Sequence, residues 1–181
     1  SEAVLGDLIS ELSIRDDLFV ATKADEEPGG DATDAQMRRS QKALRTETFD
    51  RMQVHNLRDT RVHMETIRAW QEQGRIRYSG LTHYTAGAHE ALAREMETFK
   101  PDFIQINYSL GEREAEQRVL PLAADLGIAV LINRPYQAGR LFRAVSGREL
   151  PGFAQEFASS WGQFFLKFIV SHPAVTCAIP A

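Results

Sequence analysis

Residues 119–133 read Val-Leu-Pro-Leu-Ala-Ala-Asp-Leu-Gly-Ile-Ala-Val-Leu-Ile-Asn, and this stretch decides the fold class. Its first half continues an amphipathic pattern that begins at Glu112, and this pattern predicts a helix up to Leu126, ended by Gly127. The second half, residues 128–132, is a short apolar run that predicts a buried strand. A helix followed directly by such a strand is typical of a parallel sheet covered by helices.

The same alternation runs along the whole chain. The predicted helices cover residues 1–12, 35–44, 62–73, 86–99, 112–126 and 153–171. The predicted strands cover residues 18–22, 51–55, 76–82, 103–107, 128–132 and 175–179. An acidic stretch rich in glycine and proline, residues 24–34, is predicted as a loop. Six helices alternating with six strands fit either an open doubly wound sheet or a (β/α)8 TIM barrel.

Polar residues at the ends of the predicted strands favour the barrel. Five successive strands deliver such residues: Lys23, His55, Asn56, Thr82, His83, Gln105, Asn107, Asn133 and Arg134. A barrel collects the ends of all its strands at one rim, and no Gly-x-Gly-x-x-Gly follows any strand. We therefore expect residues 1–181 to form a single, incomplete barrel domain with six of its eight strands. Because such barrels have roughly 250 residues, we expect the chain to be part of a longer protein.

Composition excludes several classes of function. The 181 residues carry 21 Lys and Arg against 25 Asp and Glu, a formal net charge of −4. No dense basic stripe or long apolar run is present, so we expect no nucleic-acid partner and no membrane span. The single cysteine, Cys177, rules out an internal disulfide and a cysteine zinc site, and suits a reducing, cytoplasmic location.

The run from Gly74 to Tyr84, Gly-Arg-Ile-Arg-Tyr-Ser-Gly-Leu-Thr-His-Tyr, resembles the fifth-strand signature of the aldo/keto reductase family. Three further stretches resemble the family's third, fourth and sixth strands: Val20–Lys23, Asp50–His55 and Phe103–Ser109. They occur in the family's order and cover nearly the whole chain. The resemblance implies an oxidoreductase on a (β/α)8 barrel that reduces an aldehyde or ketone to an alcohol with NADPH, without a metal.

The resemblance also implies roles for two residues. Lys23 matches the lysine that makes the family's proton-donating tyrosine easier to ionise, and His55 matches the histidine that orients the carbonyl. A lysine in a partly dry site must pair or shift its pKa, and a histidine can donate to negative charge developing on oxygen. The tyrosine and its partner aspartate would precede residue 1, so we expect residues 1–181 alone to be inactive.

Further matches concern the cofactor. Thr82, His83 and Gln105 match residues that bind the nicotinamide amide, whereas Asn133 replaces an aromatic residue that would stack on the ring. The other matching positions, from the strand end to the loop over the pyrophosphate, are Arg134, Pro135, Tyr136, Gly139 and Arg140. NADPH follows from the family alone, so NADH stays open, as do the substrate and the oligomeric state.

Two alternatives remain beside the reductase. A non-catalytic nucleotide-binding or regulatory barrel would have little need of Lys23 and His55. A metal-dependent barrel hydrolase would need several converging ligands, and only His55 and His83 end strands. The remaining expectations concern packing. The predicted core includes Trp70, Trp161, Cys177 and the phenylalanines 153, 157, 164, 165 and 168. The three histidines His63, His89 and His172 are predicted to lie at the surface or at helix ends.

Overall fold

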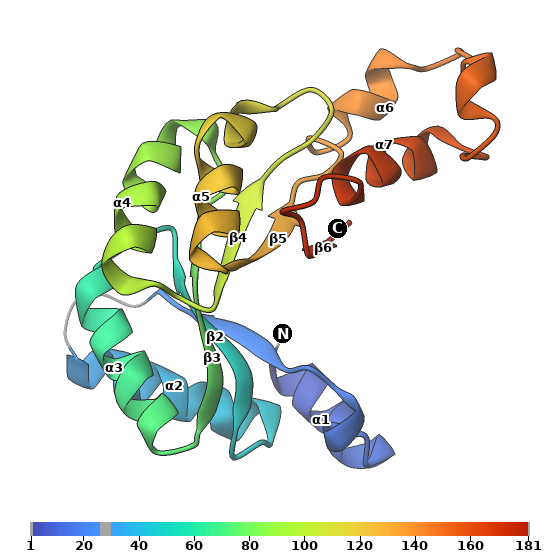
Figure 1. Cartoon of the computed structure of the whole chain (residues 1–181). Coiled ribbons are helices and arrows are strands. Elements are labelled where there is room, and N and C mark those ends of the chain that lie inside the picture. Colours follow the sequence, from blue (N-terminus) through green and yellow to red (C-terminus); the bar gives the residue numbers. More distant parts are fainter. Residues whose placement is uncertain (1, 26–29, 181) are drawn as a thin grey trace. The chain divides into compact units, whose positions relative to one another are not determined.

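The computed structural model describes residues 2–25 and 30–180, in two compact units, residues 1–82 and 83–181 (Figure 1). Each unit contains strands that pair in parallel with helices beside them. The expectation of a single domain stays a prediction beside this division. Among the described residues, no helix is both long and apolar enough to cross a membrane.

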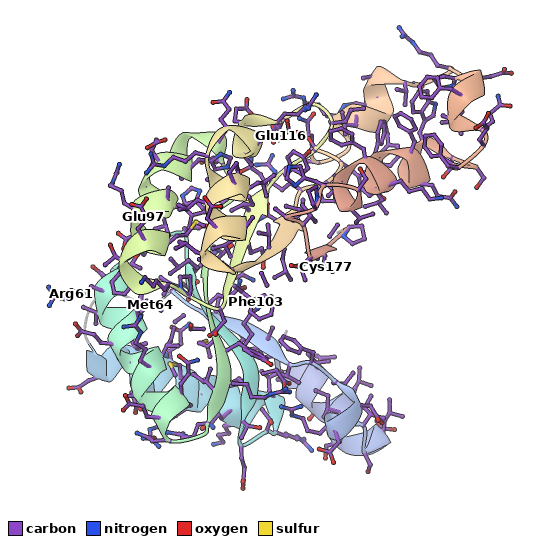
Figure 2. The ribbon with its side chains drawn as sticks, in the orientation of Figure 1. Arg61, Met64, Glu97, Phe103, Glu116 and Cys177 are labelled. Carbon is purple, nitrogen blue, oxygen red and sulfur yellow. The ribbon has the colours of Figure 1, made fainter. Side chains whose placement is uncertain are left out.

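The first unit alternates helices and strands as predicted. Its elements are α1 (Glu2–Leu12), η1 (Arg15–Asp17), β1 (Ala21–Ala24), α2 (Gly30–Leu44), β2 (Phe49–His55), α3 (Thr60–Glu72) and β3 (Ile76–Thr82). β1 pairs with β2 and β2 with β3, all in parallel. Met52 and Val54 of β2 are fully buried, and so is Met64 of α3, labelled in Figure 2. These apolar side chains fix the helices against the sheet.

The second unit repeats the pattern. Its elements are η2 (Ala86–Ala88), α4 (His89–Phe99), β4 (Phe103–Asn107), η3 (Glu114–Gln117), α5 (Val119–Leu126), β5 (Ala129–Asn133), α6 (Arg140–Ala144), η4 (Gly152–Ala154), α7 (Trp161–Val170) and β6 (Cys177–Ala178). β5 pairs in parallel with both β4 and β6. In both units each strand neighbours the next one along the chain, which confirms the predicted parallel α/β class.

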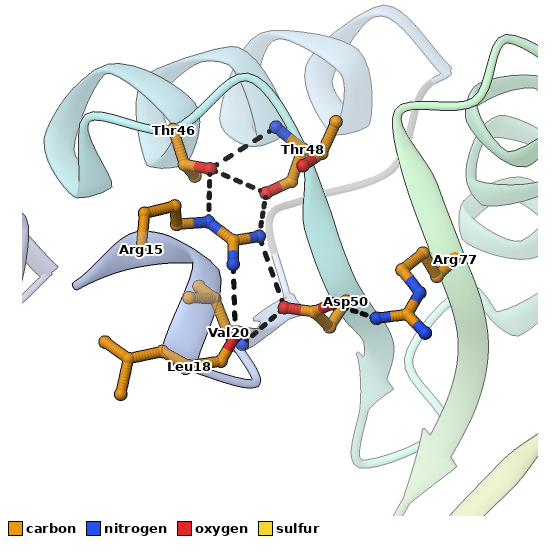
Figure 3. Close-up of polar contacts among 7 residues, drawn as sticks. All are labelled: Arg15, Leu18, Val20, Thr46, Thr48, Asp50 and Arg77. Atoms are coloured by element: carbon orange, nitrogen blue, oxygen red, sulfur yellow. Dashed lines mark hydrogen bonds and ion pairs between the residues drawn. The ribbon is translucent and has the colours of Figure 1, made fainter.

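A buried carboxylate explains why β1 starts at Ala21 and not at residue 18 as predicted. Asp50 accepts a hydrogen bond from the Val20 backbone N–H at 2.7 Å, so that amide bonds to a side chain (Figure 3). Arg15 and Arg77 form ion pairs with the same carboxylate at 3.2 and 2.8 Å. Burial alone would raise the pKa of Asp50, but the Val20 N–H and the two guanidiniums outweigh it and hold the pKa below its ordinary value.

The helix α1 rests on α2 through a glycine. Gly6 is buried, and a Cβ atom there would lie 2.8 Å from the carbonyl carbon of Leu44. The two backbones therefore approach more closely than any side chain permits. Ile9 of α1 is buried within the first unit, whereas the other large apolar residues of this helix are exposed: Val4, Leu5, Leu8 and Leu12.

The predicted helix over residues 153–171 is wrong in its first half. A regular helix begins only at Trp161, where the Ser160 side chain accepts a hydrogen bond from the Gln163 N–H. Such an N-cap satisfies a backbone donor that the helix itself cannot, so it fixes the helix start. A short helix, α6, occupies part of the region predicted as a loop, and α2 starts at Gly30, inside the loop predicted at residues 24–34.

Several packing predictions are also wrong. Phe153 and Phe157 are exposed and touch the ring of Phe164, and of the five phenylalanines only Phe165 is buried. Cys177, labelled in Figure 2, is exposed, because β6 is only two residues long and no described element covers that side chain.

Two of the histidines predicted at the surface or at helix ends are buried, and one of them, His89, is the first residue of α4. His63 lies 2.8 Å from the Thr33 hydroxyl through Nδ1, and His89 lies 3.1 Å from the Asn107 side-chain oxygen through Nε2. Each ring therefore has a polar partner that offsets the cost of burial.

Candidate active site

The first unit brings Lys23, His55 and Thr82 to one face of its sheet. In the parallel register Lys23 lies beside Gln53, and His55 lies beside Thr82. Partners in register share a face, and so do residues two apart on one strand. All three predicted residues therefore lie on the same face, near the carboxyl ends of β1, β2 and β3.

Lys23 lies in surroundings that disfavour its charge. Its side chain is half-buried, and the pKa of Lys23 is lowered first by burial and then by the positive charge of Arg51, with Asp25 acting in the opposite direction. Arg51 lies two residues before Gln53, so it shares the face of Lys23, and it is buried. Sequence reasoning missed Arg51, although the alternation of the strand already placed it on the same face as Gln53 and His55.

His55 is held by a residue of the segment predicted to be merely a loop. Its Nδ1 lies 3.2 Å from the Asp25 carboxylate. Gln36 of α2 fixes this carboxylate in turn, since its Nε2 donates to Asp25 at 2.9 Å and its oxygen accepts from the Asp25 N–H at 3.0 Å. A carboxylate can only accept, so this bond needs a hydrogen on Nδ1 and leaves Nε2 as the ring atom for a further partner.

A polar pocket of about 390 Å³ lies beside this group, within the first unit. Lys23 and Asp25 line it from β1 and the residue that follows, and Gln36 and Arg39 line it from α2. Among the described residues, no cluster of three or more histidine, cysteine, aspartate or glutamate side chains could hold a metal ion. The ionisable side chains that this group offers for chemistry are a lysine, a histidine and an aspartate.

In the second unit, a set of hydrogen bonds gathers four of the residues predicted to bind the cofactor. The His83 N–H donates to the Gln105 carbonyl at 3.0 Å, and Asn133 Nδ2 donates to the His83 carbonyl at 3.0 Å. Arg134 donates to the Tyr84 carbonyl at 3.4 Å, and its guanidinium lies 5.7 Å from the centre of the Tyr84 ring. The ends of β4 and β5 are thus tied to residues 83 and 84.

Two side chains of this set have a defined hydrogen-bonding state. His83 Nδ1 accepts from the backbone N–H groups of Tyr84 and Thr85, at 3.0 and 3.3 Å, so a neutral His83 carries its hydrogen on Nε2. Asn133 Oδ1 is a buried acceptor that has no hydrogen-bond partner among the described residues. An acceptor in this state can accept a hydrogen bond from a donor that is not part of the described chain.

The remaining predicted cofactor residues lie on the segment that leads into α6. Pro135 is buried, and the Tyr136 ring packs 4.7 Å from that of Phe142. Burial raises the pKa of Tyr136 above its ordinary value. Gly139 takes the left-handed backbone conformation that glycine favours, with φ at 81°, and Arg140 is exposed as the first residue of α6.

Comparisons with known proteins agree with this organisation. The model of the aldo/keto reductase family matches residues 1–181. A thermostable aldo-keto reductase solved with the inhibitor epalrestat has 18% sequence identity and a TM-score of 0.80, over 99% of this chain and 66% of its own. An aldo-keto reductase from Bacillus halodurans in its holo form has 19% identity and a TM-score of 0.75, over 98% and 66%.

A third solved structure is an aldo/keto reductase from Klebsiella pneumoniae in complex with NADP and acetate. It has 23% sequence identity and a TM-score of 0.79, over 99% of this chain and 65% of its own. The chain thus spans about 66% of the length of the structures it matches. At these identities the likeness shows the fold alone, and it confirms the prediction of an incomplete (β/α)8 barrel.

Proposed function

Since the chain belongs to the aldo/keto reductase family, we propose that the protein uses NADPH to reduce an aldehyde or ketone to an alcohol. The observation that carries this proposal is the group formed by Lys23, Asp25 and His55 on one face of the first unit. A reduction of this kind adds a hydride to the carbonyl carbon and a proton to its oxygen. A lysine and a histidine serve the proton half of that reaction.

Lys23 tunes the proton donor. The resemblance implies that this donor is a tyrosine, whose phenolate a nearby ammonium stabilises. Burial and Arg51 both lower the pKa of Lys23, so its proton is held less tightly than that of an exposed lysine. His55 orients the carbonyl through Nε2, because Asp25 holds Nδ1. When Nε2 carries a proton, it donates to the oxygen on which negative charge develops.

When bound, NADPH supplies the hydride. We propose that Gln105 and Asn133 of the second unit hold the nicotinamide carboxamide. The buried Oδ1 of Asn133 supports this, because a carboxamide N–H is the kind of donor that it needs. Arg140 opens α6 from an exposed position and can pair with a phosphate through both arms of its guanidinium. The same groups would serve NADH, so the choice between the two needs a measurement.

The test is the consumption of NADPH and of NADH by the protein with a series of small aldehydes and ketones. We expect turnover that requires the carbonyl compound, with a higher kcat/KM for NADPH. Tight binding of the dinucleotide without turnover of any carbonyl would overturn the proposal and favour a nucleotide-binding regulatory barrel. A higher kcat/KM for NADH would overturn the choice of cofactor alone.

A further inference from the structure

A pocket of about 780 Å³ lies in the first unit, at the opposite ends of the strands from Lys23 and His55. Thr46 and Thr48 line it where the chain enters β2, and Arg75 lines it where the chain enters β3. The two residues proposed for the reaction, Lys23 and His55, lie near the other ends of β1 and β2, so this pocket has no part in that chemistry.

Cations dominate the lining of this pocket. Arg38 and Lys42 lie four residues apart on α2, so they share one face of that helix, and Arg45 follows directly after the helix end. Arg75 adds a fourth positive charge, against which the lining offers a single carboxylate, Glu47. The lining contains no large apolar side chain, so charge and hydrogen bonding are what it offers a ligand.

Two of the four cations form no ion pair among the described residues. Arg38 pairs with Asp34 at 2.6 Å, and Arg45 pairs with Asp7. Lys42 and Arg75 have no ion-pair partner among residues 2–25 and 30–180. The neighbouring cluster of Figure 3 is different, because there Arg15 and Arg77 share the buried carboxylate of Asp50.

Arg75 is held in place before any ligand arrives. Its guanidinium lies 3.3 Å from the centre of the Trp70 ring, and it donates to the Gln41 side-chain oxygen at 2.6 Å. The pKa of Arg75 is lowered first by burial and then by the like charge of Arg38, with the negative charge of Asp34 acting in the opposite direction. An arginine fixed by stacking loses little freedom on binding, and its planar fork matches the oxygens of a phosphate.

We propose that this pocket binds a phosphate group, with Lys42 and Arg75 as its charged donors. Lys42 and Arg75 together carry two positive charges, and these match the charge of a phosphate dianion better than that of a ligand with one carboxylate. Because the lining lacks apolar side chains, the phosphate itself supplies the affinity, and a base or an acyl chain attached to it adds little. The inference does not depend on the proposed reductase activity.

The test is a titration of the ¹⁵N-labelled protein with inorganic phosphate at constant ionic strength, followed by NMR. We expect saturable shifts of the Trp70 indole and the Arg75 amide, whereas the Trp161 indole of the second unit stays unchanged. Lys42→Glu, at an exposed position, should weaken binding at least about tenfold, the scale of a hydrogen bond to a charged group. Arg94→Glu, an equal change of charge on the exposed side of α4, should leave it unaltered.

Further titrations separate the sources of the phosphate. Adenosine monophosphate should bind about as tightly as inorganic phosphate if the phosphate alone is recognised, and a much tighter nucleotide would overturn that part of the inference. Shifts that do not saturate, or equal affinity in Lys42→Glu and Arg94→Glu, would each overturn the site itself.

Discussion

Asn133 donates a hydrogen bond from its Nδ2 atom to the backbone carbonyl of His83 at 3.0 Å, and this bond joins the end of β5 to residues 83–85. The same side chain holds a buried oxygen without a partner among the described residues. The Nδ2 atom of Asn133 is therefore used by the fold, and its Oδ1 atom is available to a ligand. Substitutions can test the two roles separately.

Asn133→Ala removes both halves and should raise the Kd for NADP about fivefold, the scale of a neutral hydrogen bond. Asn133→Asp keeps an acceptor but loses the donor to His83, so its free energy of unfolding should fall while more of the affinity is retained. Calorimetric titration with NADP and urea unfolding measure the two effects. Equal NADP affinity of Asn133→Ala and the wild type would remove Asn133 from the cofactor site.

Lys23→Met should lower kcat for carbonyl reduction at least about 100-fold, because the proposed proton transfer loses the group that tunes its donor. Lys23→Arg keeps the charge and should recover part of the rate. The KM for NADPH should change little in either variant, since Lys23 is assigned to the proton half of the reaction. A kcat near that of the wild type in Lys23→Met would take Lys23 out of the mechanism.

Asp25→Asn should lower kcat about tenfold, because a misplaced catalytic ring is costly and His55 would lose the carboxylate that holds it. Asp25→Glu should restore part of the activity, whereas a merely structural role would show no such rescue. Asp31→Asn, an exposed carboxylate near the start of α2, is the matched control and should behave as the wild type. Steady-state kinetics of the three variants decide the point.

Asp50→Asn should destabilise the first unit by about 2 kcal/mol at neutral pH, the scale of hydrogen bonds to charged groups. The folded state lowers the pKa of Asp50, so its contribution is fully present above the ordinary carboxyl pKa and is lost as the pH falls through the lowered value. The difference between variant and wild type should therefore shrink in acid. Urea unfolding across this range measures it, with the exposed Asp16→Asn as the control.

The sequence predicted the strands best where the chain itself marks their ends. β3 and β4 have the predicted limits, residues 76–82 and 103–107, because Gly74 and Pro101 interrupt the preceding helical pattern and the apolar run ends in polar residues. The family resemblance pointed to Lys23 and His55 because both occupy marked strand ends. Such local signals need no knowledge of distant residues.

The parts that were missed depend on contacts between distant segments. Asp25 lies 30 positions from His55, and no periodicity records that the two side chains meet. The burial of His63 depends on Thr33 of another helix. The interrupted helix before Trp161 shows the same limit, because the spacing of the phenylalanines resembles a helix while the Ser160 cap decides where the helix starts.

Gly6 gives the attachment of α1 an unusual sensitivity. At this position the main chain of α1 contacts the main chain of α2 directly, and this close approach is possible because glycine has no Cβ atom. A single methyl group at this position would overlap the α2 backbone and force α1, a helix of eleven residues, to move away from α2. Substitutions on the exposed side of α1 should therefore be tolerated, whereas residue 6 of the chain accepts only glycine.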